Sequence, residues 1–497
     1  MSRFSGLVSL RTRRCALLAC CFVAAATHGQ TPSPTDVAPF LAVTAPVFAL
    51  NHVRVVDGTG AVAMEDQTVV VANGKIQSIG PAASFQPPRG AQVLDRSGYT
   101  VIPGLVGMHN HLYYTASVAV QVGEHGELGE PGLFIAEVPY SAPRLYLAAG
   151  VTTMRTTGSV EPYTDLKVKQ RIDSNQMPGP NIDVTAPYLE GPPTQFAQMH
   201  ELTGADDARR LVDYWAAEGA TSFKAYMNIT REELRAAIQQ AHVQKMKLTG
   251  HLCSVTWREA IALGIDDLEH GPVFTDTDFV SDKKPDLCPP GGRLHPNSWT
   301  NLDISGPQVQ ELIHDLVSHH VAVTSTLPVF EVSVPGRPKL QQRTLSAMSA
   351  ESAQSYLTAR ARIVSDSPMT ALVRKEMDFE VAFVKAGGLL LAGPDPTGNG
   401  GVLPGFGDQR EIELLVEAGF TPVQAIQIAT ENGAVYLGQQ DRVGTLVPGK
   451  QADLVLIKGD PSKHIEEIEN VETVFKAGIG YDSAKLIESV RGQVGIR

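Results

Sequence analysis

Cysteine, aromatic residues and long apolar runs are all scarce in this sequence. Only 5 of the 497 residues are cysteines and 6% are aromatic, which excludes a small scaffold held together by disulfides. No apolar run reaches the roughly 20 residues that a membrane-spanning helix requires. Basic residues are outnumbered, with 41 Lys and Arg against 53 Asp and Glu, so nucleic acid and anionic lipid are poor partners. We expect a small-molecule substrate, no nucleic acid partner and no membrane span.

The composition that remains is that of a folded protein with a large core. Hydrophobic residues make up 43% of the chain and charged residues 19%, which is typical of globular domains. The length allows several domains, or one large barrel with an attached domain.

Residues 1–29 have the pattern of a secretory signal peptide. An apolar run over residues 15–26 follows four basic side chains, Arg3, Arg11, Arg13 and Arg14. This order is typical of export signals, and a run of about a dozen apolar residues is too short to span a bilayer. We therefore predict an exported protein, either periplasmic or extracellular.

Loss of that segment would leave two cysteines, Cys253 and Cys288. In an oxidising compartment the two could form one disulfide. A free thiol near the functional site is an equally good interpretation, since Cys253 follows a candidate ligand by two residues.

Short strands with tight turns occur at both ends of the folded region. Residues 45–100 contain strand-like segments separated by Asp57-Gly58 and by Asn73-Gly74, which are typical hairpin turns. Residues 437–497 repeat this texture. We predict a small β-sandwich domain built from both segments.

The segment between them, residues 101–436, alternates short apolar strands with helical patterns, as a parallel α/β domain does. Eight βα units predict a TIM barrel. The expected strands are Leu105–His111, Val151–Thr156, Ile182–Ala186, Ser222–Tyr226, Leu248–Cys253, Asp267–His270, Val321–Ser325 and Leu389–Asp395. The expected helices include Asp206–Glu218, Arg231–Gln244 and Thr256–Leu263. Two longer insertions, residues 271–305 and 332–367, are candidate lids over the active face.

Residues that bind metals recur at the ends of these expected strands. His109 and His111 end the first strand, and alternate residues of a strand point the same way, so both imidazoles can reach one ion. A His-x-His pair alone is a weak signal, because it also occurs in polar turns. The other strand-end candidates are Lys224, His251, His270 and Asp395. Residues from several strand ends are what a barrel active site requires.

Six ordered segments of the sequence resemble the amidohydrolase superfamily. The likeness spans nearly the whole mature chain. The segments are VIPGLVGMHNH at 101–111, GATSFK at 219–224, GH at 250–251, LEHG at 268–271, AGPD at 392–395 and PGKQADL at 448–454.

The resemblance implies a site for two divalent metal ions, with zinc as the default. His109, His111 and Asp395 would hold one ion, and His251 and His270 the other. Lys224 would bridge them as N6-carboxylysine. An unmodified lysine is a cation that two divalent ions repel, whereas its carbamate is an oxygen ligand.

Further roles follow from the same resemblance and from position. Asp395 would take a proton from the attacking water and return it to the leaving nitrogen. Tyr226, two residues after the lysine, would hydrogen-bond the substrate carbonyl or oxyanion, with core packing as the alternative. Arg155 would bind a substrate carboxylate. Tyr113 and Tyr114 would line the substrate pocket, together with His125; packed loop residues are the alternative for all three.

We therefore predict an exported metal-dependent amidohydrolase that cleaves an amide C–N bond of N-acyl amino acids or dipeptides. It resembles the branch that contains imidazolonepropionase-like, prolidase-like and ochratoxin-hydrolysing carboxypeptidases, and ochratoxin-type aryl amides fit it too. A cyclic amidase or lactonase with the same metal pair is an alternative. A scaffold without catalysis is disfavoured, since all six ligand positions are present. We also expect a homo-oligomer.

Overall fold

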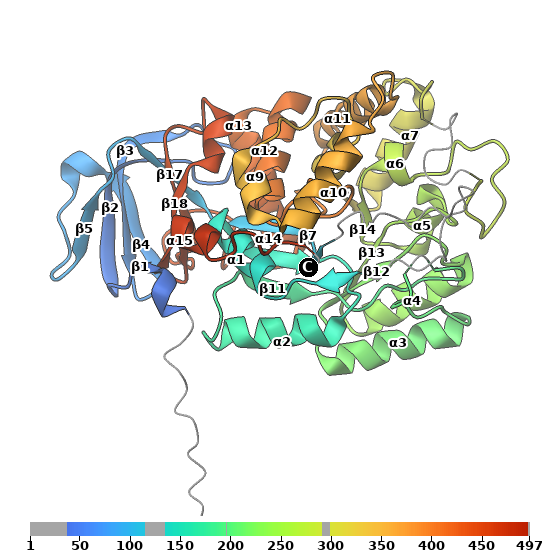
Figure 1. Ribbon diagram of the computed structural model, residues 1–497, viewed down its shortest axis with the longest axis horizontal. Helices are drawn as coiled ribbons and strands as arrows, with labels where there is room; N and C mark the ends of the chain where they lie inside the picture. The colour runs from blue at the N-terminus through green and yellow to red at the C-terminus, as the bar shows by residue number, and fades with distance from the viewer. Residues whose placement is uncertain (1–36, 115–134, 195, 291–298, 496–497) are drawn as a thin grey trace, which may run out of the picture.

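The computed structural model describes residues 37–114, 135–194, 196–290 and 299–495. The expected signal peptide and His125 lie outside this part of the chain. A β-sheet domain lies at one end of the long axis, and an α/β body extends from it (Figure 1).

Strands from both ends of the chain meet in one nine-stranded sheet, ordered β1-β19-β18-β17-β6-β2-β3-β4, with β5 paired to β2. Asn73 and Gly74 both have positive φ between β3 and β4, as a tight two-residue hairpin turn requires. Buried apolar residues on one side of these strands, among them Phe48, Leu454 and Phe475, form a core of their own. The strands are β1 (Leu41–Val43), β2 (Val47–Val55), β3 (Met64–Ala72), β4 (Lys75–Pro81), β5 (Gln92–Asp95), β6 (Tyr99–Pro103), β17 (Leu454–Lys458), β18 (Val471–Lys476) and β19 (Ile479–Asp482).

The α/β body contains two parallel sheets, one ordered β11-β10-β7 and one ordered β12-β13-β14-β15-β16. An isolated parallel bridge joins Thr185 to Ser222 between the sheets. At the other edges, the backbone N–H of Asp395 donates to the carbonyl of His109 at 3.0 Å. The strands are β7 (Leu105–Asn110), β10 (Val151–Thr156), β11 (Asn181–Val184), β12 (Ser222–Ala225), β13 (Lys247–Gly250), β14 (Asp267–Glu269), β15 (Ala322–Ser325) and β16 (Leu390–Ala392). A short hairpin, β8 (Tyr113–Tyr114) with β9 (Ala136–Glu137), follows β7.

All eight expected strands of this body are present, and β10 has the expected bounds. Several others end earlier than expected. The clearest case is β16, which ends at Ala392 instead of Asp395. A side chain at Gly393 would collide with the backbone of His109 at 2.2 Å, and Pro394 cannot donate a ladder hydrogen bond. The ligand candidate Asp395 therefore lies on a turn beyond the strand.

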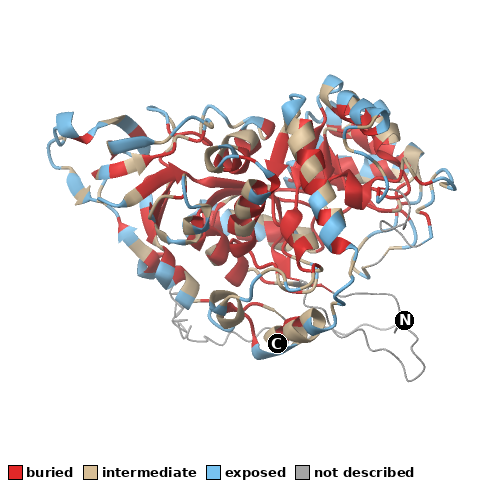
Figure 2. Ribbon diagram, turned by 90° about the horizontal axis from the view of Figure 1, so that it is seen from above, coloured by how far each residue is buried: buried red, intermediate tan, exposed pale blue. Residues whose placement is uncertain are grey.

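Helices cover the outer faces of the parallel strands, and the buried residues gather in the strands they enclose (Figure 2). The expected helices agree with α3, α4 and α5 within one residue at each end. The start of α4 is a capping box of Thr230 and Glu233, which satisfies free backbone N–H groups. The α-helices are α1 (Ser141–Ala148), α2 (Pro162–Asp173), α3 (Ala205–Glu218), α4 (Arg231–Val243), α5 (Trp257–Leu263), α6 (Pro272–Thr275), α7 (Pro307–Ser318), α8 (Leu327–Glu331), α9 (Gln342–Ala347), α10 (Ala350–Ala361), α11 (Met369–Lys385), α12 (Phe406–Ala418), α13 (Pro422–Gln427), α14 (Gly433–Tyr436) and α15 (Ser483–Glu488).

Cys253 and Cys288 form a disulfide, with their Cα atoms 5.0 Å apart. Of the two alternatives left open by the sequence, the structure therefore contains the bridge. It ties the loop after β13 to the insertion at residues 271–305. Among the described helices, none has the length and apolar character needed to cross a bilayer.

Candidate metal centre

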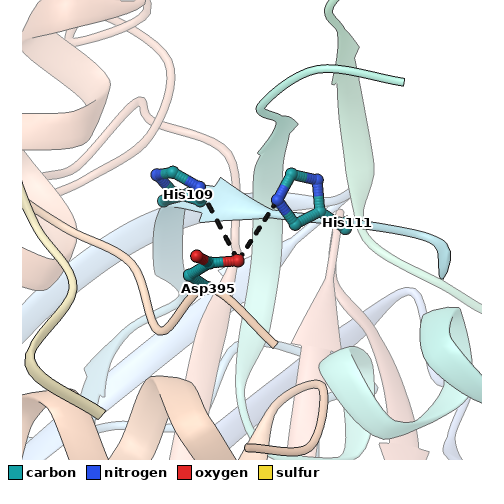
Figure 3. Close-up of side chains that lie close together, drawn as sticks. All are labelled: His109, His111 and Asp395. Carbon is teal, nitrogen blue, oxygen red and sulfur yellow. Dashed lines mark ion pairs between the residues drawn. The ribbon is translucent and has the colours of Figure 1, made fainter. Parts of the chain in front are cut away.

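Three potential metal ligands converge where β7 and β16 end. The donor atoms of His109, His111 and Asp395 all lie within 4.8 Å of one another, and all three residues are buried. Asp395 Oδ1 is 3.3 Å from His111 Nε2 and 3.8 Å from His109 Nε2. Figure 3 shows both imidazoles directed at this carboxylate. Among the described residues, this is the one group of three such side chains close enough to share an ion.

The second nitrogen of each histidine is already engaged. His109 Nδ1 lies 2.7 Å from a carboxylate oxygen of Glu269, and His111 Nδ1 lies 3.2 Å from the carbonyl oxygen of Gly158. Both partners are acceptors, so each Nδ1 carries the hydrogen and each Nε2 keeps its lone pair toward Asp395. This arrangement is typical of histidines that ligate metals.

Electrostatics favour the ligand forms of these groups. Burial lowers the pKa of His109 well below its usual value, and the Lys224 charge lowers it further. Burial also lowers the pKa of His111. Burial by itself would raise the pKa of Asp395, but the surrounding imidazoles of His109, His111 and His270 hold it well below the usual range. Neutral imidazoles beside an ionised carboxylate are the states that bind a cation.

Lys224 on β12 lies beside this cluster. Its Nζ is 3.3 Å from His109 Nε2 and 3.2 Å from the carbonyl oxygen of Thr157. The side chain is 1% exposed, and this burial lowers the pKa of Lys224 to about 8. Lys224 is therefore an interior side chain with a lowered pKa and not a surface lysine.

The rings of the remaining two histidines pack next to the cluster. The rings of His251 and His270 are 4.3 Å apart, and those of His270 and His109 are 4.5 Å apart. His270 Nδ1 is 2.8 Å from Thr326 Oγ1 and 3.9 Å from Asp395 Oδ2. All six residues expected from the sequence thus lie in one region at the strand ends.

Two of these residues have an unusual backbone. His270 has φ of 74° and Asp395 has φ of 48°, which is the left-handed region that side chains usually avoid. Gly271 continues the turn with φ of 76°, and a side chain there would meet the Glu376 carboxylate at 1.8 Å. Such strained positions concentrate at functional sites.

Tyrosines form one wall of the site. Tyr113 stacks on His111 at 4.4 Å, and Tyr226 packs edge-on against His251 at 4.9 Å. Tyr188, which sequence reasoning missed, lies between them: its hydroxyl is 2.5 Å from that of Tyr113 and its ring 4.8 Å from that of Tyr226. Its position just beyond an expected strand end, after Pro187, was a signal that could have found it.

Two expected substrate-binding residues are engaged elsewhere. Arg155 is 1% exposed and points into the body below the ligands, where its Nη2 donates to Asp267 at 2.8 Å and to Glu269 at 2.9 Å. The Tyr114 hydroxyl donates to the carbonyl of Gly400 at 2.7 Å. We therefore assign no substrate contact to either residue.

The donor set fits divalent metal ions. Imidazole and carboxylate ligands suit zinc, manganese or cobalt, and the fixed Nδ1–H groups make Nε2 the nitrogen of each ring that can ligate a cation. His109, His111 and Asp395, the closest set, would hold an ion, which would supply a polarised water for hydrolysis.

Known proteins resemble this chain over different lengths. An imidazolonepropionase of Herpetosiphon aurantiacus is 21% identical over 428 residues, which are 81% of this chain and 86% of that protein. An imidazolonepropionase of Idiomarina loihiensis is 32% identical over 89 residues, which are 17% of this chain and only 22% of that protein.

Solved structures share the fold. The chain matches A. niger ochratoxinase with a TM-score of 0.60 at 18% identity, covering 91% of this chain and 100% of that one. A Xaa-Pro dipeptidase matches with a TM-score of 0.62 at 18% sequence identity, covering 88% of this chain and 100% of that one. A bottromycin amidohydrolase matches with a TM-score of 0.64 at 20% identity, covering 90% of this chain and 91% of that one.

The profile of the amidohydrolase family matches residues 100–279 and 397–479, more than half of the chain. The match includes the strands that carry five of the six ligand candidates; Asp395 falls between the two matched ranges. The chain belongs to the amidohydrolase family, and it is a metal-dependent hydrolase that acts on carbon–nitrogen bonds.

Proposed function

We propose that this enzyme cleaves the amide bond of N-acyl amino acids or dipeptides at a site with two metal ions. One observation carries the proposal: Asp395 and His270 approach within 3.9 Å, so the His109, His111 and Asp395 set adjoins the His251 and His270 pair. His251 and His270 are imidazole donors of the kind that bind divalent ions, and they could hold a second ion beside the first. When bound, two ions would lower the pKa of the attacking water and would polarise the substrate carbonyl.

The bridging role of Lys224 is part of the proposal. Its buried Nζ lies 3.3 Å from His109 Nε2. A neutral amine adds to CO₂ to form an N–C bond and releases one proton, which yields a carbamate anion. A pKa of about 8 for Lys224 makes the neutral amine accessible near neutral pH. The product would supply oxygen ligands where an ammonium would repel cations.

The protein's own groups would move the protons. Asp395 is ionised and 8% exposed at the centre of the cluster, so it can accept a proton from the attacking water and deliver it to the leaving nitrogen. The Tyr226 ring lies against His251, and we propose that its hydroxyl donates to the oxyanion.

The wall of the site suits an apolar acyl or side-chain group. Tyr113, Tyr188, Tyr226, Met227 and Cys253 belong to one buried cluster. Aromatic rings and a disulfide present mostly apolar surface with a few polar points, which is the usual character of a small-molecule pocket. Ochratoxin-type aryl amides fit this wall as well as dipeptides do.

Two broader features complete the proposal. The bridge at Thr185 and Ser222 and the hydrogen bond from Asp395 to His109 join the edges of the two parallel sheets, which supports a closed barrel of eight strands. The Cys253–Cys288 disulfide supports export, because disulfides persist in oxidising compartments.

A substrate screen tests the proposal. Metal-replete enzyme is assayed against N-acyl amino acids and dipeptides varied at the C-terminal residue, with hydantoins and lactones as parallel arms. Asp395→Asn protein made in the same way is the control for contaminating hydrolases. We expect turnover of acyclic amides with apolar groups. Turnover confined to cyclic amides or lactones would replace the proposed substrate class.

A further inference from the structure

Strand β14 carries two buried acids directly before a metal-ligand candidate. Asp267 and Glu269 are both 0% exposed, and His270 follows them. Alternate residues of a strand face the same side, so both carboxylates point into the body beneath the ligands. Buried carboxylates are costly unless each is paired and hydrogen-bonded.

Glu269 accepts from donors on three other strands. One carboxylate oxygen lies 2.7 Å from His109 Nδ1. The other accepts from Arg155 Nη2 at 2.9 Å and from Thr249 Oγ1 at 2.5 Å. These contacts fix the carboxylate from several sides, so it holds the His109 ring in one orientation.

We propose that Glu269 is a positioning residue for metal binding, acting through His109; the inference rests on the two-metal function proposed above. A carboxylate that accepts from Nδ1–H fixes the tautomer and makes Nε2 a stronger ligand. Because His270 is the next residue of the chain, one strand end both supplies a ligand of the second ion and orients a ligand of the first.

Arg155 has a supporting role in this arrangement. Its Nε donates to the carbonyl of Met108 at 2.8 Å, and its Nη2 reaches both acids. One guanidinium thus offsets part of the charge of two carboxylates. Since Arg155 is fixed by Met108, directly before His109, it also ties Glu269 to the strand that carries the ligand.

The alternative is that Glu269 only stabilises the core as the ion-pair partner of Arg155. Asp267 provides the matched comparison, because it lies on the same strand, is equally buried and bonds the same Arg155 nitrogen. Its other contacts are the hydroxyls of Thr324 and Thr249. None of the contacts described for Asp267 reaches His109.

The test compares Glu269→Gln with Asp267→Asn. Zinc affinity of the full-length protein is measured by competition with a chromophoric chelator, the visible spectrum of the cobalt-loaded protein reports ligand geometry, and the melting temperature of the metal-free protein reports core stability. We expect Glu269→Gln to weaken zinc binding about 10- to 100-fold, as loss of such an outer partner does. Asp267→Asn should leave zinc affinity close to that of wild type, because none of the contacts described for Asp267 reaches His109, although both variants lose stability.

A milder pair covers the case in which these variants fail to fold. Thr249→Val removes a donor to Glu269, whereas Thr324→Val removes donors only to Asp267 among these acids. Thr249→Val should weaken zinc binding about 2- to 10-fold, the value of one hydrogen bond, and Thr324→Val should not.

Equal zinc affinity and unchanged cobalt spectra in Glu269→Gln and wild type would overturn the inference, as would equal losses in both members of either pair. Wild-type protein that bound no zinc or cobalt would instead overturn the proposed function, on which the inference rests. The substrate need not be known for any of these measurements.

Discussion

The interior of the parallel strands has two polar layers that differ in how their charges are balanced. In the upper layer, at the strand ends, Lys224 Nζ and His109 Nε2 lie 3.3 Å apart. These two groups would repel each other if both were protonated. In the lower layer, Arg155 lies 2.8 Å from Asp267 and 2.9 Å from Glu269, so opposite charges meet directly. A hydrogen bond between Glu269 and His109 joins the two layers.

This difference indicates that the upper layer is suited to chemistry and the lower layer to stabilising the fold. Burial lowers the pKa of Lys224 to about 8, so the upper layer holds its groups in forms suited to ligation and proton transfer. In the lower layer, the two acids raise the pKa of Arg155 above its usual value despite burial. Charged groups that are fully paired within the protein are poor candidates for binding substrate. Groups whose pKa is shifted by burial and by neighbours of the same charge are better candidates for a functional role.

The largest expected effect comes from the upper layer. Lys224→Ala should abolish activity and lose about one metal equivalent, because two cations would face each other without a shared anion. Metal content by elemental analysis and turnover of the best substrate from the screen check this. Lys247→Ala is the control, since that lysine lies at the start of β13 and donates to the carbonyl of Tyr436. An alanine variant at 224 that kept two metals and full turnover would refute the carbamate assignment.

Asp395→Asn should lower kcat with little change in KM. The amide occupies the same space but cannot accept the proton, and general acid–base groups contribute about 10²- to 10⁴-fold. Steady-state kinetics at fixed metal occupancy make the measurement. A raised KM at unchanged kcat would reassign Asp395 to substrate binding alone.

A smaller and different effect is expected from the lower layer. Arg155→Leu should lower the free energy of unfolding by about 3 to 5 kcal/mol, since it leaves buried acids without their partner. The ratio of kcat/KM for free and C-terminally amidated substrates should not change. Denaturant unfolding and the two substrates check both parts.

The control for Arg155→Leu is Arg374→Leu, at an exposed ion pair with Asp378, which should cost about 1 kcal/mol or less. If Arg155→Leu selectively lost activity on the free acids and kept its stability, the original expectation of carboxylate binding would be restored.

The sequence predicted the strands and the ligand candidates because both depend on local pattern. The expected strand Val151–Thr156 has the observed bounds, and the six ligand candidates follow strand ends, where parallel topology brings them together. The sequence could not show how far each side chain lies from the strand ends inside the α/β body. Arg155 lies only one residue before the end of β10, yet it bonds acids of β14, a strand in the other sheet.

Contacts across the interior are set by which strands lie opposite each other, and no local pattern encodes that. The same limit explains Tyr188. A tyrosine after Pro187 reads as an ordinary loop residue until its hydroxyl is found 2.5 Å from that of Tyr113. Tyr114 follows Tyr113 in the sequence, but its hydroxyl donates to the backbone carbonyl of Gly400 instead. Adjacency along the chain therefore did not predict a shared orientation.

The nine-stranded sheet constrains the order in which the molecule can be completed during synthesis. Strand β6 (Tyr99–Pro103) pairs along its whole length with β17 (Leu454–Lys458). Strand β6 is synthesised long before β17, which lies in the last tenth of the chain. The two strands can therefore pair only late in synthesis. Contacts between such distant segments form slowly. The sheet that holds the amino-terminal strands therefore cannot be completed until nearly the whole chain has been synthesised.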